Sequence, residues 1–65
     1  MHVQFADANE AVIISYFCCQ QDPIYYAFLG EVEVDDPRYI VFYEKMPDYV
    51  QVNLPAPIYQ IQNQA

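Results

Sequence analysis

Hydrophobic and polar residues alternate over residues 1–5, and a mainly apolar run then covers residues 11–19. Alternation with a period of two is typical of a half-buried strand, and a β-branched and aromatic run is typical of a strand covered on both faces, by the fold or by a partner. Turn-forming residues occupy positions 7–10 between the two runs. The pattern therefore predicts an antiparallel hairpin over the first 19 residues.

Two Asp-Pro pairs divide the middle of the chain. Asp22 and Pro23 favour a short helical turn closed by Gly30. Asp36 as N-cap and Pro37 as first residue predict a helix over 37–45, ended by the Met-Pro pair at 46–47. Between these signals, the Glu-Val-Glu-Val sequence at 31–34 alternates as a strand does.

The last part of the chain alternates again from residue 49 to residue 54 and is then interrupted by Pro-Ala-Pro. These prolines favour an extended, polyproline-like segment. We therefore expect an α+β fold: a small β-hairpin or antiparallel sheet with one short helix near 37–45, in a single domain of residues 1–53, followed by an extended arm of residues 54–65. Such an arm could add a strand to a partner's sheet or form an edge strand of its own sheet.

The composition is unusually apolar for so short a chain. Of the 65 residues, 55% are hydrophobic and 17% aromatic, although a chain of this size buries only about 60% of the surface that its unfolded form exposes. We infer that part of the aromatic surface contacts another protein, with a compact monomer carrying half-exposed tyrosines as the alternative. The residues predicted to carry that contact are Tyr25, Tyr26, Phe28, Tyr39, Phe42 and Tyr43, together with Leu54, Ile58, Tyr59 and Ile61 of the arm.

A net charge of −7 opposes binding to nucleic acids and to anionic membranes but permits binding to a basic protein surface. No apolar run approaches the roughly 20 residues of a membrane span, and no signal peptide is recognisable. The expected partner is therefore a protein, with a homo-oligomer as a possibility, and the expected site of synthesis is the cytoplasm.

The acidic residues of the middle segment are the strongest candidate for chemistry. On a strand, Glu31, Glu33 and Asp35 would lie on one face, with Asp36 beginning the next element. A solvated polar face is the expected role of this row, because acid/base catalysis needs a pocket and a calcium site needs more oxygen ligands at loop spacing. For Arg38, the expected role is an intrachain ion pair, with a partner's carboxylate as the alternative.

The remaining reactive residues form no catalytic or ligand-binding pattern. Cys18 and Cys19 are expected to be buried, reduced, and on opposite faces of a strand. The single histidine, His2, lacks further metal ligands, and Ser15 lacks a nearby base. We therefore expect no enzymatic activity, no metal, no cofactor and no small-molecule substrate.

Part of this sequence resembles a known class of proteins. Gln-Asp-Pro at 21–23, followed by Glu-Val-Glu-Val-Asp-Asp-Pro-Arg-Tyr at 31–39 and an aromatic run, is similar to a segment of small tailed-bacteriophage proteins encoded near tail-fibre genes. The resemblance covers about residues 12–43. It implies contact with a fibre or baseplate protein, first in the host cytoplasm during assembly and then in the tail of the virion. The larger assembly proteins of this class continue into a second domain that has no counterpart here.

Two functions follow as hypotheses. The first is a non-enzymatic structural protein that docks on a larger phage tail or fibre protein through its aromatic surface and by strand addition. The second is an acidic inhibitor that imitates nucleic acid and blocks a host defence protein, for which the motive is the net charge and the acidic row. A transcriptional or toxin-antitoxin accessory is a residual alternative.

Overall fold

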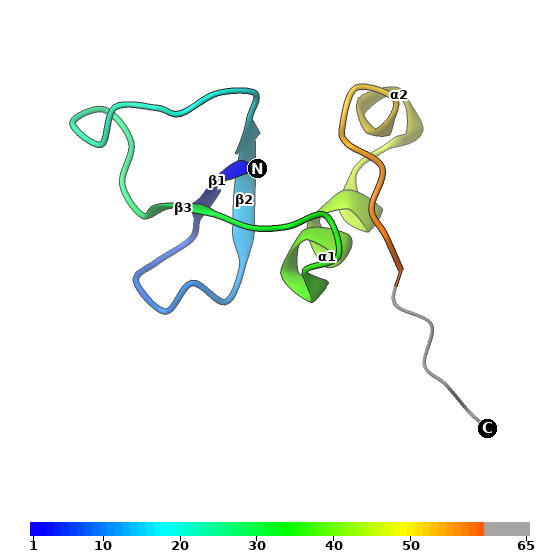
Figure 1. Ribbon diagram of the computed structural model, residues 1–65, viewed down its shortest axis with the longest axis horizontal. Coiled ribbons are helices and arrows are strands. Elements are labelled where there is room, and N and C mark those ends of the chain that lie inside the picture. Colours follow the sequence, from blue (N-terminus) through cyan, green and yellow to red (C-terminus); the bar gives the residue numbers. More distant parts are fainter. Residues whose placement is uncertain (60–65) are drawn as a thin grey trace.

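A three-stranded antiparallel sheet and two short helices make up the fold of the computed structural model, which describes residues 1–59 (Figure 1). The elements are β1 (His2–Phe5), β2 (Ile13–Phe17), β3 (Leu29–Glu31), α1 (Pro37–Lys45) and α2 (Asp48–Gln51). The strand order is β2-β1-β3, so β2 and β3 are the edge strands. This arrangement confirms the predicted α+β class.

β1 and β2 form the predicted hairpin. The carboxylate of Asp7 accepts a hydrogen bond from the backbone N–H of Asn9 at 3.0 Å, and the Ala6 N–H donates to the carbonyl of Val12 at 2.9 Å. Along the ladder, Gln4 pairs with Ser15 but Phe5 pairs with Ile13, so Ile14 has no opposite residue. This β-bulge turns Ile14 away from the ladder and leaves its side chain exposed.

β3 pairs with β1 from His2 to Gln4, and the only glycine of the chain lies in it. Gly30 is opposite Val3, and a Cβ atom at this position would lie 2.6 Å from Cε2 of the Phe5 ring. The absence of a side chain therefore lets the buried Phe5 ring lie directly over the backbone of β3.

α1 begins and ends where the sequence predicts. The carboxylate of Asp36 accepts a hydrogen bond from the Arg38 N–H at 2.8 Å, with Pro37 at the first helical position. Met46 closes the helix by donating its N–H to the carbonyl of Tyr43. Lys45 in the last turn has the sign that the helix dipole favours.

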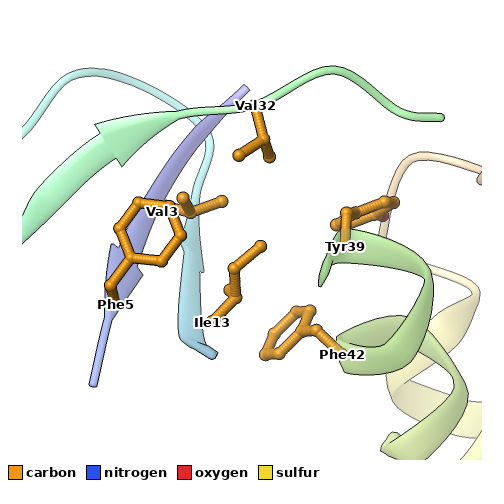
Figure 2. Close-up of a cluster of buried hydrophobic side chains, with 6 residues drawn as sticks. All are labelled: Val3, Phe5, Ile13, Val32, Tyr39 and Phe42. Carbon is orange, nitrogen blue, oxygen red and sulfur yellow. The ribbon is translucent and has the colours of Figure 1, made fainter. Parts of the chain in front are cut away.

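The hydrophobic core lies between the sheet and α1. Figure 2 shows side chains from the strands pointing toward two rings of the helix. The buried residues are Val3, Phe5, Ile13, Val32, Tyr39 and Phe42. So small a core agrees with the limited burial expected for this chain length.

Three local predictions are wrong. The alternating residues from Tyr49 onward were expected to be extended, but they form the helix α2 and the turn that follows it. Pro47 caps the start of this helix. The side-chain amide of Gln51 connects the helix to α1 by donating to the carbonyl of Tyr43 at 2.9 Å. The segment after Pro23 makes a turn and no helix, and Gly30 belongs to a strand. β3 ends at Glu31, although Val32 still exchanges backbone hydrogen bonds with Met1 at 2.9 and 3.0 Å.

The segment after α2 returns along its own domain. The Tyr39 hydroxyl donates to the carbonyl of Pro55, and the Ile58 N–H donates to the carbonyl of Val34 at 3.1 Å. Tyr59 reaches the Glu44 carboxylate with its hydroxyl at 3.1 Å. The first part of the predicted arm is therefore extended but bound to this chain.

Candidate interaction surface

Four exposed apolar side chains gather on the connection between β2 and β3. Ile24 is 83% exposed and Tyr25 is 79% exposed, and Tyr26 and Phe28 are also exposed. We call residues 22–28 the aromatic loop. In Figure 1 this connection projects from the strands on the side away from both helices. Three of the residues predicted for partner contact, Tyr25, Tyr26 and Phe28, are thereby brought together on one loop.

Asp22 builds the tip of the aromatic loop. Its carboxylate accepts a hydrogen bond from the Ile24 N–H at 2.9 Å, and its carbonyl accepts from the Tyr25 N–H at 3.0 Å. Such an Asx turn reverses the chain without a helix. It leaves the side chains of Ile24 and Tyr25 in solvent instead of packing them on the sheet. The sequence prediction missed Ile24, although the Asp-Pro pair before it marks the turn.

Phe28 has a backbone conformation that bulky residues rarely adopt. Its φ is 57°, in the left-handed region, where a non-glycine residue costs on the order of 1 kcal/mol. The carbonyl of Phe28 accepts the Phe5 N–H at 2.8 Å, and the neighbouring Ala27 carbonyl accepts the Gln4 side-chain amide at 3.1 Å. These two bonds hold the base of the loop to β1 and leave the Phe28 ring exposed.

Tyr26 provides a second anchor of the loop, to β2. Its ring centroid lies 4.9 Å from that of Phe17, at an interplanar angle of 59°. Tilted ring pairs at this distance are favourable. The loop is therefore held at Tyr26 and at Phe28, on the C-terminal side of its tip, and the side chains of Ile24 and Tyr25 before these anchors remain in solvent.

A second apolar region lies between β2 and α1. A groove of about 200 Å³ separates these elements. Its lining includes Val12, Ile13, Arg38, Val41, Phe42 and Lys45. Val12 and Val41 are half exposed, and so is Ile14 of β2. This groove lies at the free edge of the sheet, because β2 pairs only with β1. The prediction that β2 is covered on both faces is not met within this chain.

Two of the residues predicted to contact a partner are buried instead. Tyr39 is 0% exposed and Phe42 is 7% exposed, because the three-residue spacing along α1 turns both rings toward the sheet. Burial raises the pKa of Tyr39 to about 12, so its hydroxyl remains a hydrogen-bond donor. Tyr43 and Leu54 are half buried and pack against the same core.

The predicted arm residues divide differently. Ile58 and Tyr59 are more than half exposed, although each makes a hydrogen bond to its own domain. Burial and the Glu44 carboxylate raise the pKa of the Tyr59 hydroxyl. Ile61 lies outside the described residues.

The acidic residues do not form one row on a strand. Glu31 and Glu33 are exposed on either side of the buried Val32, but a turn follows at residues 34–35. Asp36 belongs to the helix cap, where its two carboxylate oxygens bind the Arg38 guanidinium at 3.0 and 2.8 Å. This pairing lowers the pKa of Asp36.

Arg38 therefore makes the predicted kind of intrachain ion pair, with Asp36 as its partner. The same guanidinium donates to the carbonyl of Glu10 at 2.6 Å and lies 5.0 Å from the centre of the Phe5 ring. It links the turn of the hairpin to the start of α1.

Cys18 and Cys19 differ from their prediction as well. Both thiols are free and exposed, because the chain bends directly after β2 and leaves the sheet. Their sulfur atoms lie 4.0 Å apart. The hydrogen bond and charge of Cys18 raise the pKa of the Cys19 thiol.

Within residues 1–59, no three His, Cys, Asp or Glu side chains are grouped closely enough to hold a metal ion. Nor does this part of the chain contain a helix with the length and apolar character needed to cross a membrane. Comparison with protein-family models, curated proteins and solved structures finds no match to the chain.

Proposed function

We propose that this chain is a non-catalytic interaction protein that docks on a larger protein through its aromatic loop. The observation that carries the proposal is the exposure of Ile24 and Tyr25 at the tip of a loop whose following residues are held to β1 and β2. Burying an apolar side chain of this size contributes about 1.5–3 kcal/mol of free energy, and each side chain that stays in water lacks this contribution. A partner pocket would supply that burial, and aromatic anchors of this kind often dominate binding energy.

The proposed partner is a tail or fibre protein of a tailed bacteriophage. This step rests on the resemblance of about residues 12–43 to small phage proteins encoded near tail-fibre genes. The aromatic loop lies within that segment. The chain would bind during assembly in the host cytoplasm and remain in the virion tail.

Docking through the loop favours a partner whose contact surface is apolar at its centre and not acidic at its rim. The chain has a net charge of −7, so an acidic rim would be repelled, whereas Lys or Arg side chains would attract it over distances of roughly 8 Å at physiological salt. We expect salt to slow association moderately while leaving the apolar contact intact.

The acidic-inhibitor alternative is less well supported by the arrangement of charges. A nucleic-acid mimic needs regularly spaced carboxylates, but Asp36 is neutralised by Arg38 and the exposed Glu31 and Glu33 are followed by a turn. A complex with a basic DNA-handling protein that dissociates steeply with added salt would favour this alternative over the docking proposal.

The proposal is tested by incorporation into phage particles. Particles of the phage that encodes the chain are purified and analysed by mass spectrometry, and the chain is expected at a fixed ratio to a tail protein. If it is absent from intact particles, it is no virion component.

The loop itself is tested with a matched pair of variants in the same phage. Ile24→Ser with Tyr25→Ser removes the tip of the aromatic loop, whereas Tyr49→Ser with Val52→Ser removes side chains of 76% and 79% exposure near α2. We expect the loop variant to reduce incorporation at least about tenfold, corresponding to 1.4 kcal/mol or more, and the control to leave it unchanged. Equal incorporation of both variants would contradict docking through the loop.

A further inference from the structure

The adjacent thiols of Cys18 and Cys19 lie where the chain leaves β2. On a regular strand, neighbouring side chains point to opposite faces. Here the bend after Phe17 brings the two sulfur atoms to 4.0 Å of each other, and both remain exposed. An exposed pair of converging thiols is not explained by packing, and the docking function does not use it.

A disulfide between these residues fits poorly. Adjacent Cα atoms are about 3.8 Å apart across a trans peptide bond, whereas disulfides join Cα atoms separated by roughly 4.4–6.8 Å. The chain contains no cis peptide bond that would change this geometry among its described residues. Closing the sulfur atoms to about 2.05 Å would therefore strain the peptide between them.

One ion placed between the two sulfur atoms fits much better. Bonds of about 2.3 Å from each thiolate span the observed 4.0 Å at a sulfur-metal-sulfur angle of about 120°. A tetrahedral angle would need a separation of about 3.8 Å, which a small side-chain rotation supplies. Thiolate ligands favour soft and borderline cations such as Zn²⁺ and Cd²⁺ over Mg²⁺ or Ca²⁺.

We propose that Cys18 and Cys19 together form a two-thiolate binding site for a single thiophilic cation of the zinc group. Binding breaks both S–H bonds, forms two metal–sulfur bonds and releases two protons to solvent. The remaining coordination positions are open to water or to a ligand from a docked partner, because no third protein ligand is grouped with the cysteines in the described part of the chain.

The neighbours of the two cysteines suit such a site. The side-chain amide of Gln21 donates to the Cys19 carbonyl at 3.2 Å and lies 3.8 Å from its sulfur atom. An N–H group directed toward a ligating sulfur stabilises its thiolate form, as outer partners of metal ligands do. Both thiols lose their protons when they bind a cation, so binding should be accompanied by measurable acidification.

Cadmium titration of the reduced full-length chain under anaerobic conditions tests the site. The thiolate-to-cadmium charge-transfer absorbance reports sulfur coordination, which binding to surface carboxylates does not produce. We expect saturation at one Cd²⁺ per chain. In Cys18→Ser and in Cys19→Ser, the affinity should fall roughly 100-fold or more, because each variant loses the second, intramolecular contact. Gln21→Ala should weaken binding by a smaller factor.

Both cysteines are exposed, so their replacement by serine is not expected to unfold the chain, and circular dichroism checks this. Three results would overturn the proposal: no charge-transfer band in the wild-type chain, equal affinity in a single-serine variant, or saturation at one Cd²⁺ per two chains.

Discussion

Gly30 has a role that depends on a single neighbour. A Cβ atom there would meet the ring of Phe5, which is itself buried between the sheet and α1. A buried ring has little room to move, because protein interiors are densely packed. The need for glycine therefore arises from close approach and not from its φ angle, since no glycine has a positive φ.

Gly30→Ala is expected to lower the free energy of unfolding by about 1–3 kcal/mol, because it overpacks the core. Urea denaturation measures the loss. Glu31→Ala, at an exposed position of the same strand, serves as the control and should change stability much less. Phe5→Leu combined with Gly30→Ala should lose less than the sum of the two single changes, and simple additivity would contradict the proposed clash.

At the scale of elements, local chemistry predicts some boundaries and tertiary contacts decide the others. Local chemistry specifies the limits of α1: the Asp36 side chain caps it, Pro37 starts it, and Pro47 forces the preceding Met46 into an extended conformation, so the sequence was sufficient there. α2 was missed because four residues carry little periodicity, and its position depends on a bond from Gln51 to α1.

The candidate surface was only partly predictable for a related reason. Aromatic content selected Tyr25 and Tyr26 as contact residues together with Tyr39 and Phe42, without indicating which of these rings are buried. The structure exposes the first two and buries the other two. Which rings are buried depends on how α1 faces the sheet, and that orientation is a property of packing.

The convergence of Cys18 and Cys19 depends on a bend that has no signature in the sequence.

The cap of α1 should make stability depend on pH. Arg38 lowers the pKa of Asp36 in the folded chain, below the value of about 3.9 of an unfolded chain. Asp36 therefore stabilises the fold above about pH 4, and this contribution is lost as the pH falls through the lowered pKa. Asp36→Ala should cost about 1 kcal/mol at pH 7 through loss of the cap.

Urea denaturation of the wild-type chain, Asp36→Asn and Asp36→Ala between pH 7 and pH 3 tests this dependence. Asn retains a capping oxygen but no charge, so it isolates the ion pair. The difference in stability between the wild-type chain and Asp36→Asn should shrink toward low pH. A difference that is constant over this range would show that the carboxylate charge is not responsible.

At the scale of the whole molecule, the segment after α2 contributes to the domain onto which it folds. Tyr39 is fully buried, and its hydroxyl has the Pro55 carbonyl as its acceptor. The backbone bond from Ile58 to Val34 adds a second attachment. The boundary predicted at residue 53 thus separates two parts that are in contact.

A chain ending at Leu54 should be less stable than one ending at Tyr59 by about 1–3 kcal/mol, because the buried Tyr39 hydroxyl loses its partner. Thermal or urea denaturation of both chains measures the difference. In a Tyr39→Phe background the same truncation should cost less, since no hydroxyl remains to be satisfied. Equal losses in the two backgrounds would assign the effect to other contacts of residues 55–59.

The position of β2 at the edge of the sheet has a consequence for handling the isolated chain. Residues 11–19 carry no charge and no proline, which are the usual means of keeping edge strands from pairing with other molecules. Their main protections are the bulge at Ile14 and mutual repulsion between acidic copies. Acidification toward pH 4 or high salt removes the second protection, so fibrils or precipitate should form under those conditions before they form in dilute neutral buffer.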